Sequence, residues 1–533
     1  MALAPLDVWA RLLFRKVTFP APRYLARIVL GVTTSVFGTA VTLPERLVLA
    51  PYLWLRFGRP GSANRTTADV GSENGTTGGV GSENRPTHRP EVVVIAGYYR
   101  SGTTHLHYLL SCDPSMKTPR WAHVSTPQGW FISWFLVRVF MIPFVSNSRP
   151  QDDVAFGPEW PSEDDFASNN WSLTSSLPGR FIVPSQYEHY ERFHSLDRLT
   201  DRERQRWRRT LASFCWKLMA LSPNKKLLLK TPSHTARLSE LHEMFGDGLR
   251  VIHISRDPDA VVRSNVRMAE RLEPYSFEPM PDAATVRERV VREFVETEDR
   301  FCAQAQALGP GRVAMLRFED LIADPLGQLH RCYDELGMEW TQASEVRFRR
   351  YLGAVRDYKP RHGGEAKKPE LEPPLAKLAE RFGHDKPGIE PKLIEHEPVQ
   401  PIRDHRAAIL AWLTALVLGL GWMGWAALMH DRTDPLMWIF GIVLGLVAVR
   451  TAGRGSPKLG LITAGAYAAL IAASIWPVTY LAYGHQWDEP TWAQAWTGVR
   501  TSMTASNNLL LIAFGLVSAY RVATRIHVRP PGT

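Results

Sequence analysis

The feature that most constrains the fold is a series of long uncharged segments after residue 400. Residues 407–429 form a run of 23 residues without a charged side chain, and residues 459–484 and 501–520 are similar in length. A helix needs roughly 20 apolar residues to cross a bilayer. Residues 435–449 form a shorter run of 15 and would span only with help from their flanks. Together these runs predict an all-helical membrane domain of about four spans over residues 407–533.

The basic residues around these segments predict their orientation. One basic group precedes the segment at residues 407–429, one follows the segment at residues 435–449 and one follows the segment at residues 501–520. If the four segments all span, these three groups lie on the same side of the membrane. Cytoplasmic loops are enriched in Lys and Arg. We therefore expect a multi-pass membrane protein whose large preceding domain lies in the cytoplasm. The basic residues are Arg403, Arg406, Arg450, Arg454, Lys458, Arg521, Arg525 and Arg529.

Residues 1–60 hold a second apolar region. Residues 28–44 form an uncharged run of 17, residues 47–55 are also apolar, and several arginines precede them. Such a segment could span once, re-enter the membrane or lie in its interface. A single crossing would conflict with a cytoplasmic domain unless the N-terminus lay outside. We therefore expect residues 28–55 to dock at the membrane interface.

Two segments have the composition of flexible connections. Residues 61–90 hold an imperfect ten-residue repeat, GSANRTTADV, GSENGTTGGV and GSENRPTHRP, whose small polar residues cannot bury a core. Residues 366–406 are rich in Pro, Lys and Glu over most of their length and are expected to lead to the membrane. The segment between these linkers, residues 91–365, is expected to be the main folded domain.

Residues 91–365 alternate apolar strand candidates with helical stretches. Apolar strands that alternate with helices indicate a mainly parallel sheet covered by helices on both faces. The predicted fold class is therefore α/β, with a P-loop-like parallel sheet followed by an all-α transmembrane bundle. The strands are predicted at residues 91–96, 227–230, 249–254 and 313–317, and the clearest helices at residues 235–245 and 286–308.

Charge and cysteine content restrict the chemistry. The formal net charge is +10 and the isoelectric point is about 9.4, which suits an anionic substrate, a negatively charged membrane surface or nucleic acid without choosing among them. The chain has four cysteines, widely spaced and without a CxxC pair, so neither a disulfide framework nor a thiolate metal site is expected. They are Cys112, Cys215, Cys302 and Cys332.

The clearest local motif follows the first predicted strand, EVVVIA. It reads Gly97-Tyr-Tyr-Arg-Ser-Gly-Thr-Thr104 and leads into the helical residues 105–110. A strand, a glycine-containing turn and a helix start form a cradle for anions, because backbone N–H groups and the helix N-terminus point inward. The glycine spacing matches a nucleotide P-loop, but Thr103 stands where that loop has lysine, and the cation is Arg100. A kinase or NTPase needs that lysine and is therefore disfavoured.

The order Arg-Ser-Gly-Thr-Thr after a strand resembles the 5′-phosphosulfate-binding loop of the sulfotransferase superfamily, especially its tyrosylprotein-like and bacterial branches. The resemblance implies that the co-substrate is 3′-phosphoadenosine 5′-phosphosulfate (PAPS). It also implies a P-loop-like domain that binds this nucleotide sulfate donor. The donor-binding residues in this loop are then Tyr99, Arg100, Ser101, Gly102, Thr103 and Thr104.

A second motif, LRVIHISRDPDAVVRS, occupies residues 249–264. It predicts a strand, then Arg256-Asp-Pro, then a helix that brings Ser264 to the same side after about two turns. A guanidinium and a hydroxyl that converge in this way can bind one phosphate dianion. The motif resembles the 3′-phosphate site of the same family. Residues 157–167, 227–234 and 317–325 extend the resemblance, which covers about residues 91–340.

Transfer of a sulfuryl group to a hydroxyl is an in-line displacement that depends on positioning and charge stabilisation. Arg100 is expected to hold the 5′-phosphate and the sulfuryl oxygens of the donor. Lys230, at the end of a predicted strand, is expected to stabilise charge on the bridging oxygen. The reaction requires no metal, and none is expected.

The general base is less well defined. In the tyrosylprotein-like branch a glutamate follows the second strand, whereas the corresponding residues 117–123 here contain no carboxylate. His123 is the nearest group that could accept a proton. Glu163 and Asp164, in the acidic segment that resembles the bacterial branch, are the other candidates. We prefer Glu163 to His123.

The sequence therefore predicts a PAPS-dependent sulfotransferase that acts on a hydroxyl of a membrane-associated or lipid-like acceptor. Its expected partners are the nucleotide donor, the acceptor and the membrane, and not nucleic acid. Two alternatives stay open, namely a P-loop-type kinase or NTPase and a catalytically silent membrane-anchored nucleotide-binding scaffold. The acceptor itself stays open among lipid, glycolipid, steroid-like and carbohydrate hydroxyls.

Overall fold

The computed structural model describes most of the chain. The expected repeat linker at residues 61–90 lies outside the described residues, as do residues 366–370 and 393–403 of the linker expected at residues 366–406. Four of the arginines used for the orientation, Arg403, Arg454, Arg525 and Arg529, also lie outside them. The described residues are 3–14, 22–57, 91–131, 133, 137, 148–149, 151–152, 154–355, 371–392, 404–453, 455–484, 491–504 and 506–524.

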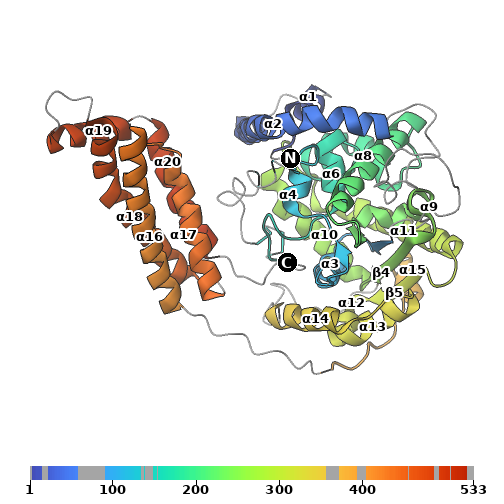
Figure 1. Cartoon of the computed structure of the whole chain (residues 1–533). Coiled ribbons are helices and arrows are strands. Elements are labelled where there is room, and N and C mark those ends of the chain that lie inside the picture. Colours follow the sequence, from blue (N-terminus) through green and yellow to red (C-terminus); the bar gives the residue numbers. More distant parts are fainter. Residues whose placement is uncertain are drawn as a thin grey trace, which may run out of the picture.

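A sheet of five parallel strands lies at the centre of the α/β domain (Figure 1), in the order β2-β3-β1-β4-β5. The four apolar strands predicted from the sequence are confirmed, and β2 was not predicted because it has only two residues. The strands are β1 (Val92–Ala96), β2 (Met116–Lys117), β3 (Lys226–Lys230), β4 (Leu249–Ser255) and β5 (Val313–Arg317).

Helices cover both faces of this sheet. Alternate residues of a strand point to opposite faces, so Val92 and Val94 belong to one apolar core and Val93 and Ile95 to another. The predicted fold class, a parallel sheet with helices on both faces, is therefore confirmed. The first core includes α8 (Asp201–Ala220), α9 (Leu238–Phe245) and α11 (Ala283–Leu308), and the second includes α3 (Thr103–Leu110), α13 (Pro325–Glu335) and α14 (Gln342–Val355).

Polar side chains cap the starts of several helices. Asp282 accepts the N–H of Thr285, so α11 starts three residues before the predicted residue 286. The predicted helix at residues 235–245 begins instead as a 3-10 helix over Pro232–Ala236 and continues as α9. The other α-helices described in this domain are α4 (Trp121–Ser125), α6 (Asp164–Ser172), α7 (Tyr187–Ser195), α10 (Pro258–Leu272), α12 (Phe318–Ala323) and α15 (Pro373–Arg381).

The N-terminal helices α1 (Leu6–Phe14) and α2 (Pro22–Phe57) lie against the α/β domain (Figure 1). Near one end of α2, Arg27 donates a hydrogen bond to the carbonyl of Ser276 at 2.9 Å. Toward the other end, Glu45 accepts the N–H of Ser133 at 3.1 Å. These contacts are 18 residues apart, or about 27 Å along a helix. One side of α2 is therefore attached to the domain over much of its length.

The C-terminal helices pack against one another in a bundle (Figure 1). The closest approach is between α17 and α20, where a side chain on Gly441 would collide with the carbonyl of Gly515. Small residues at such points let helix backbones approach closely in a membrane. The helices are α16 (Asp404–Met429), α17 (Leu436–Ala452), α18 (Pro457–Tyr483), α19 (Trp492–Thr504) and α20 (Ser506–Ala523).

Three described helices are long and apolar enough to cross a membrane, over Pro22–Tyr52, His405–Met429 and Pro457–Tyr483. Leu436–Ala452 and Asn508–Ala523 are shorter apolar helices. The predicted fourth span, residues 501–520, is wrong at its start, because α19 ends at Thr504 and α20 begins at Ser506.

The glycine contact between α17 and α20 can be tested by adding one methyl group. Gly441→Ala should lower the free energy of unfolding of the bundle by about 1–3 kcal/mol, because the helices must separate to admit the Cβ atom. The measurement is the midpoint of thermal unfolding of the full chain in detergent. Gly421→Ala is the matched control, since its Cβ would meet no atom within 4 Å. Equal midpoints for the two variants would contradict this packing.

Candidate active site

The candidate site lies where the parallel strands end. In a parallel sheet all carboxyl ends face one edge, which is where such folds bind ligands. At this edge β1 leads into the loop of residues 97–104, β3 ends at Lys230, and β4 is followed by Arg256. The structure therefore brings together groups that are far apart in the sequence.

The loop of residues 97–104 is tightly curled. Arg100 has a φ of 71° and Gly102 a φ of 98°, both in the left-handed region. A side chain at Gly102 would collide with the ring of Phe318, so only glycine fits there. Ser101 donates through Oγ to the Tyr98 carbonyl at 2.7 Å and closes the turn. The loop thus delivers its backbone directly to the N-terminus of α3, which begins at the buried Thr103.

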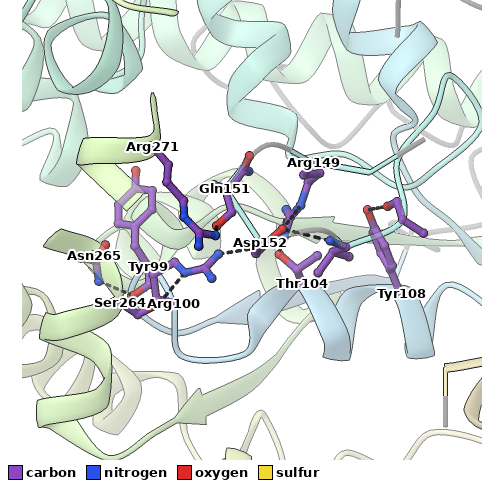
Figure 2. A network of polar contacts seen from close by, with 12 residues as sticks. Tyr99, Arg100, Thr104, Tyr108, Arg149, Gln151, Asp152, Ser264, Asn265 and Arg271 are labelled. Atoms are coloured by element: carbon purple, nitrogen blue, oxygen red, sulfur yellow. Dashed lines mark hydrogen bonds and ion pairs between the residues drawn. The ribbon is translucent and has the colours of Figure 1, made fainter. Parts of the chain in front are cut away.

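The Arg100 side chain lies at the centre of a polar network (Figure 2). Its Nε donates to Ser264 at 3.0 Å, and its terminal nitrogen contacts Asp152 at 2.6 Å. Arg149 contacts the same Asp152 carboxylate at 2.5 Å and lies 3.4 Å from Thr104 Oγ1. Two guanidinium groups therefore hold one anionic group beside the loop, which is the geometry of a site for an oxyanion.

Arg256 and Ser264 meet at the loop, as their motif predicted. Arg256 donates to the Arg100 carbonyl at 3.2 Å, and its guanidinium lies 4.7 Å from the centre of the Phe318 ring. Ser264 contacts the Arg100 side chain instead. The next residue, Asn265, donates to the Tyr99 carbonyl at 2.9 Å (Figure 2). Arg256, which precedes α10, and Asn265, within α10 (Pro258–Leu272), therefore hold the loop at two consecutive carbonyls.

The Tyr99 side chain supports the loop from within the protein. Its hydroxyl lies 3.3 Å from Ser233 Oγ, and the Arg180 guanidinium lies 4.4 Å from the centre of its ring. Burial raises the pKa of Tyr99 to about 12, so the phenol stays neutral. Tyr99 thus reaches the site through its backbone.

Lys230 connects the loop to the acidic segment. Its Nζ lies 3.3 Å from Thr104 Oγ1 and 2.5 Å from Glu163 Oε1. Only 2% of the Lys230 side chain is exposed, and burial lowers its pKa although Glu163 acts in the opposite direction. A buried ammonium, a hydroxyl and a carboxylate therefore meet at the end of the loop.

A buried pair fixes Glu163 relative to Lys230. Asp164, the next residue, accepts from Thr231 at 3.1 Å and contacts His234 at 2.7 Å. Burial raises the pKa of Asp164, but His234 and the hydrogen bonds outweigh it and hold the pKa below its ordinary value. Asp164 was a candidate base and is instead joined to the residues that follow β3, so it holds α6 against the strand end.

His123 lies at the start of α4. Its Nδ1 accepts the N–H of Arg120 at 3.2 Å, and its ring stacks on Trp130 with centroids 4.4 Å apart. Burial, together with nearby cations led by Arg120, lowers the pKa of His123 well below its ordinary value. The neutral ring therefore carries its proton on Nε2, because Nδ1 is an acceptor.

An aromatic surface lies beside Glu163. Phe166 follows it by three residues in the first turn of α6, and Trp121 contacts both Phe166 and Phe156 with ring centroids 4.7 Å apart in each pair. All three rings are half-buried. Partly exposed aromatic rings of this kind can pack against an apolar molecule.

Sequence reasoning missed three residues of the site. Arg149 and Asp152 belong to a segment without a recognisable motif, and only the folded chain brings them to Arg100. Asn265 could have been found, because it follows Ser264 directly and its amide can bond a loop carbonyl. The predicted residues Arg100, Lys230 and Glu163 all belong to one connected set of contacts.

Comparison with solved structures gives overlaps over most of the chain. Sulfotransferase STF9 from Mycobacterium avium has a TM-score of 0.46 and 16% sequence identity, and the match covers 74% of this chain and 98% of that one. Sulfotransferase STF1 from Mycobacterium tuberculosis H37Rv has a TM-score of 0.43 at 16% identity, and the match covers 72% of this chain and 99% of that one.

Comparison of sequences identifies the family more specifically than comparison of structures. A model of a sulfotransferase family matches residues 90–342. Omega-hydroxy-beta-dihydromenaquinone-9 sulfotransferase Stf3, from Mycobacterium bovis and Mycobacterium tuberculosis, is 31% identical over 271 residues, which cover 50% of this chain and 68% of the relative. Human carbohydrate sulfotransferase 6 is 33% identical over 122 residues, or 20% of this chain and 31% of the relative. Because Stf3 is 31% identical to this chain and more than two thirds of its length is matched, the chain belongs to the sulfotransferase family and is a sulfotransferase enzyme.

Proposed function

We propose that this sulfotransferase moves the sulfuryl group of PAPS to a hydroxyl of a lipid-like acceptor at the membrane. The family implies a sulfonate donor and a hydroxyl acceptor, and the identity of both is our proposal. The observation that carries it is the contact of Lys230 with both Thr104 and Glu163 at the end of the loop of residues 97–104.

The charge of the site fits PAPS. Four cationic side chains lie beside the loop, and two carboxylates form ion pairs with them. This excess of positive charge favours an anion that displaces Asp152 from between Arg100 and Arg149. The loop amides and the N-terminus of α3 would hold the 5′-phosphate. Arg256 and Ser264 would hold the 3′-phosphate. The four cations are Arg100, Arg149, Lys230 and Arg256, and the two carboxylates are Asp152 and Glu163.

The proposed reaction is an in-line displacement at sulfur. The acceptor oxygen forms a bond to sulfur while the bond from sulfur to the bridging phosphate oxygen breaks. Lys230 and Arg100 stabilise the negative charge that develops on the donor. Glu163 accepts the proton of the acceptor hydroxyl, and 3′-phosphoadenosine 5′-phosphate leaves with the bridging oxygen.

Glu163 is a better base than His123 for a physical reason. A base must present a free lone pair to the hydroxyl proton. The Nδ1 lone pair of His123 already accepts the Arg120 N–H, and its Nε2 carries a proton. The carboxylate of Glu163 touches Lys230, so a proton that it accepts lies beside the group that stabilises the leaving oxygen.

Two observations support a lipid-like acceptor. The relative Stf3 is named for a hydroxylated dihydromenaquinone. The aromatic surface of Trp121, Phe156 and Phe166 begins three residues from Glu163 and suits an apolar molecule whose hydroxyl points at that carboxylate. We therefore infer that the acceptor carries its hydroxyl on an apolar chain or ring.

We further propose that the helices of residues 407–533 anchor the enzyme in the membrane with the transferase domain, residues 91–365, in the cytoplasm. The apolar helices α16 and α18 support the anchoring. The clustering of basic residues on one side of the expected spans supports the orientation.

The donor and the need for Arg100 can be tested together. Transfer of labelled sulfate from PAPS to a membrane-lipid extract should fall at least about 100-fold in Arg100→Ala, because the variant loses charge stabilisation at the donor. Arg292→Ala, on the exposed surface of α11, is the matched control. Calorimetry should show that 3′-phosphoadenosine 5′-phosphate binds more tightly than ATP. Preference for ATP would overturn the proposal.

Removal of the base should affect turnover more than donor binding. Glu163→Gln keeps the shape of the side chain but removes the proton acceptor, so kcat should fall about 10²–10⁴-fold while KM for PAPS changes little. Glu270→Gln, on exposed α10, should leave kcat unchanged. If His123→Asn lowered kcat more than Glu163→Gln, in variants with native thermal stability, His123 would be the base instead.

The lowered pKa of Lys230 predicts a pH dependence. The protonated ammonium is the active form, so on the alkaline side kcat should be lost as pH rises through the pKa of Lys230. Because burial lowers that pKa, the loss should occur below the value of about 10.4 of an exposed lysine. Lys230→Arg should move the loss to higher pH, since guanidinium stays charged. An unchanged alkaline limb in Lys230→Arg would exclude Lys230 as its origin.

A further inference from the structure

The helix α2 exposes a large apolar side. The side that contacts the rest of the protein is mixed, because it buries the apolar Tyr24 and Ile28 together with Ser35, Thr42 and Glu45, all at most 8% exposed. The opposite side carries large apolar residues that are exposed, among them Val36 at 51% and Leu47 at 67%. A water-soluble domain would bury such apolar residues rather than expose them.

The exposed apolar residues of α2 form one continuous surface. They recur at intervals of three, four or seven residues, so they share one side of the helix. The helix is attached to the domain along its other side, and a helix with this arrangement lies in the membrane interface with its apolar side in the acyl region. The residues are Leu25, Val29, Val36, Leu43 and Leu47, with Leu30 and Val48 beside them.

A basic cavity opens next to this surface. Its volume is about 610 Å³, and it is lined by residues of α1, α2, α6 and α8. Five arginines and only one carboxylate, that of Asp7, are among the residues that line the cavity. Asp7 forms ion pairs with Arg11 at 3.0 Å and with Arg46 at 3.4 Å. The five arginines are Arg11, Arg46, Arg202, Arg206 and Arg209.

Three of these arginines form a stripe on α8. Arg202, Arg206 and Arg209 follow each other at intervals of four and three residues and are exposed. Neighbouring arginines on other sides of α8 pair with acids, as Arg208 does with Glu240. Among the residues that the structure describes, the three arginines of the stripe have no acidic partner within ion-pair distance.

We propose that this cavity binds the phosphate-bearing headgroup of an anionic phospholipid, in a membrane whose acyl region receives the apolar side of α2. The charge of the cavity is complementary to a phosphodiester, and its guanidinium groups can donate several hydrogen bonds to one. Ala50 and Arg46 of α2 line the cavity, so the headgroup lies next to the apolar surface formed by Leu43, Leu47 and Val48. A phospholipid likewise has a phosphate-bearing headgroup next to apolar acyl chains.

The cavity is not part of the donor site, and the proposal does not depend on the donor. The two are connected by α6, which begins after Glu163 and ends at Ser172. Arg11 donates to the Trp171 carbonyl in the last turn of α6 at 3.3 Å. A bound headgroup would therefore lie one short helix, about 13 Å, from the carboxylate of the site.

The test compares two lipids beside α2 in the full chain. Leu47→Cys, in a Cys302→Ser background, carries a bimane label, and the protein is reconstituted in nanodiscs of mixed phosphatidylcholine and phosphatidylglycerol. In one sample the phosphatidylglycerol has brominated acyl chains that quench bimane, and in the other the phosphatidylcholine has them in equal amount. We expect phosphatidylglycerol to quench at least about twofold more strongly, because the arginines enrich it there.

The stripe on α8 provides the decisive variants. Arg202→Gln, Arg206→Gln and Arg209→Gln together should bring the quenching ratio to one, whereas replacement of the same three residues by lysine should preserve a ratio above one. Lys225→Gln, Arg292→Gln and Arg347→Gln remove the same charge from exposed positions elsewhere and should leave the ratio unchanged. Three results would each overturn the proposal. They are a quenching ratio of one in the protein with its three native arginines, equal quenching ratios in that protein and in the Arg→Gln variant, and no quenching by either brominated lipid.

Discussion

The contact between the Lys230 ammonium and the Glu163 carboxylate, at 2.5 Å, is the interaction on which the site depends. It joins the end of β3 to the start of α6 beside the loop. Neither charge is well solvated there, so each needs the other. Buried bonds behind it, from Asp164 to His234 and Asp165 to Arg237, hold the two elements at this distance.

Much of the fold followed from local pattern. The four longer strands are short and mainly apolar, and such segments indicate buried parallel strands. The loop and the Arg256 motif could be predicted because their function requires particular residues at short spacing. Arg149 and Asp152 could not, because their contact with Arg100 depends on how a segment without a motif folds back.

The choice of base shows a second limit of sequence. The sequence favoured Glu163 over His123 as the proposed base, and the structure adds the hydrogen bond that Nδ1 of His123 accepts. The polarity of α2 shows a third limit. Its apolar content could be predicted, but which side is buried depends on partners such as Ser133 and Ser276, which lie far along the chain.

The attachment of α2 has a consequence for biosynthesis. The helix leaves the ribosome before any strand of the sheet, yet the groups that bind its polar side, near residues 131–133 and 273–276, are made much later. Until then only residues that precede α2, such as those of α1, can pack against it, and its apolar side favours a lipid surface. With α2 docked on the membrane as proposed, the α/β domain would complete its folding against a helix that already rests there, so nascent chains would be localised before they are active.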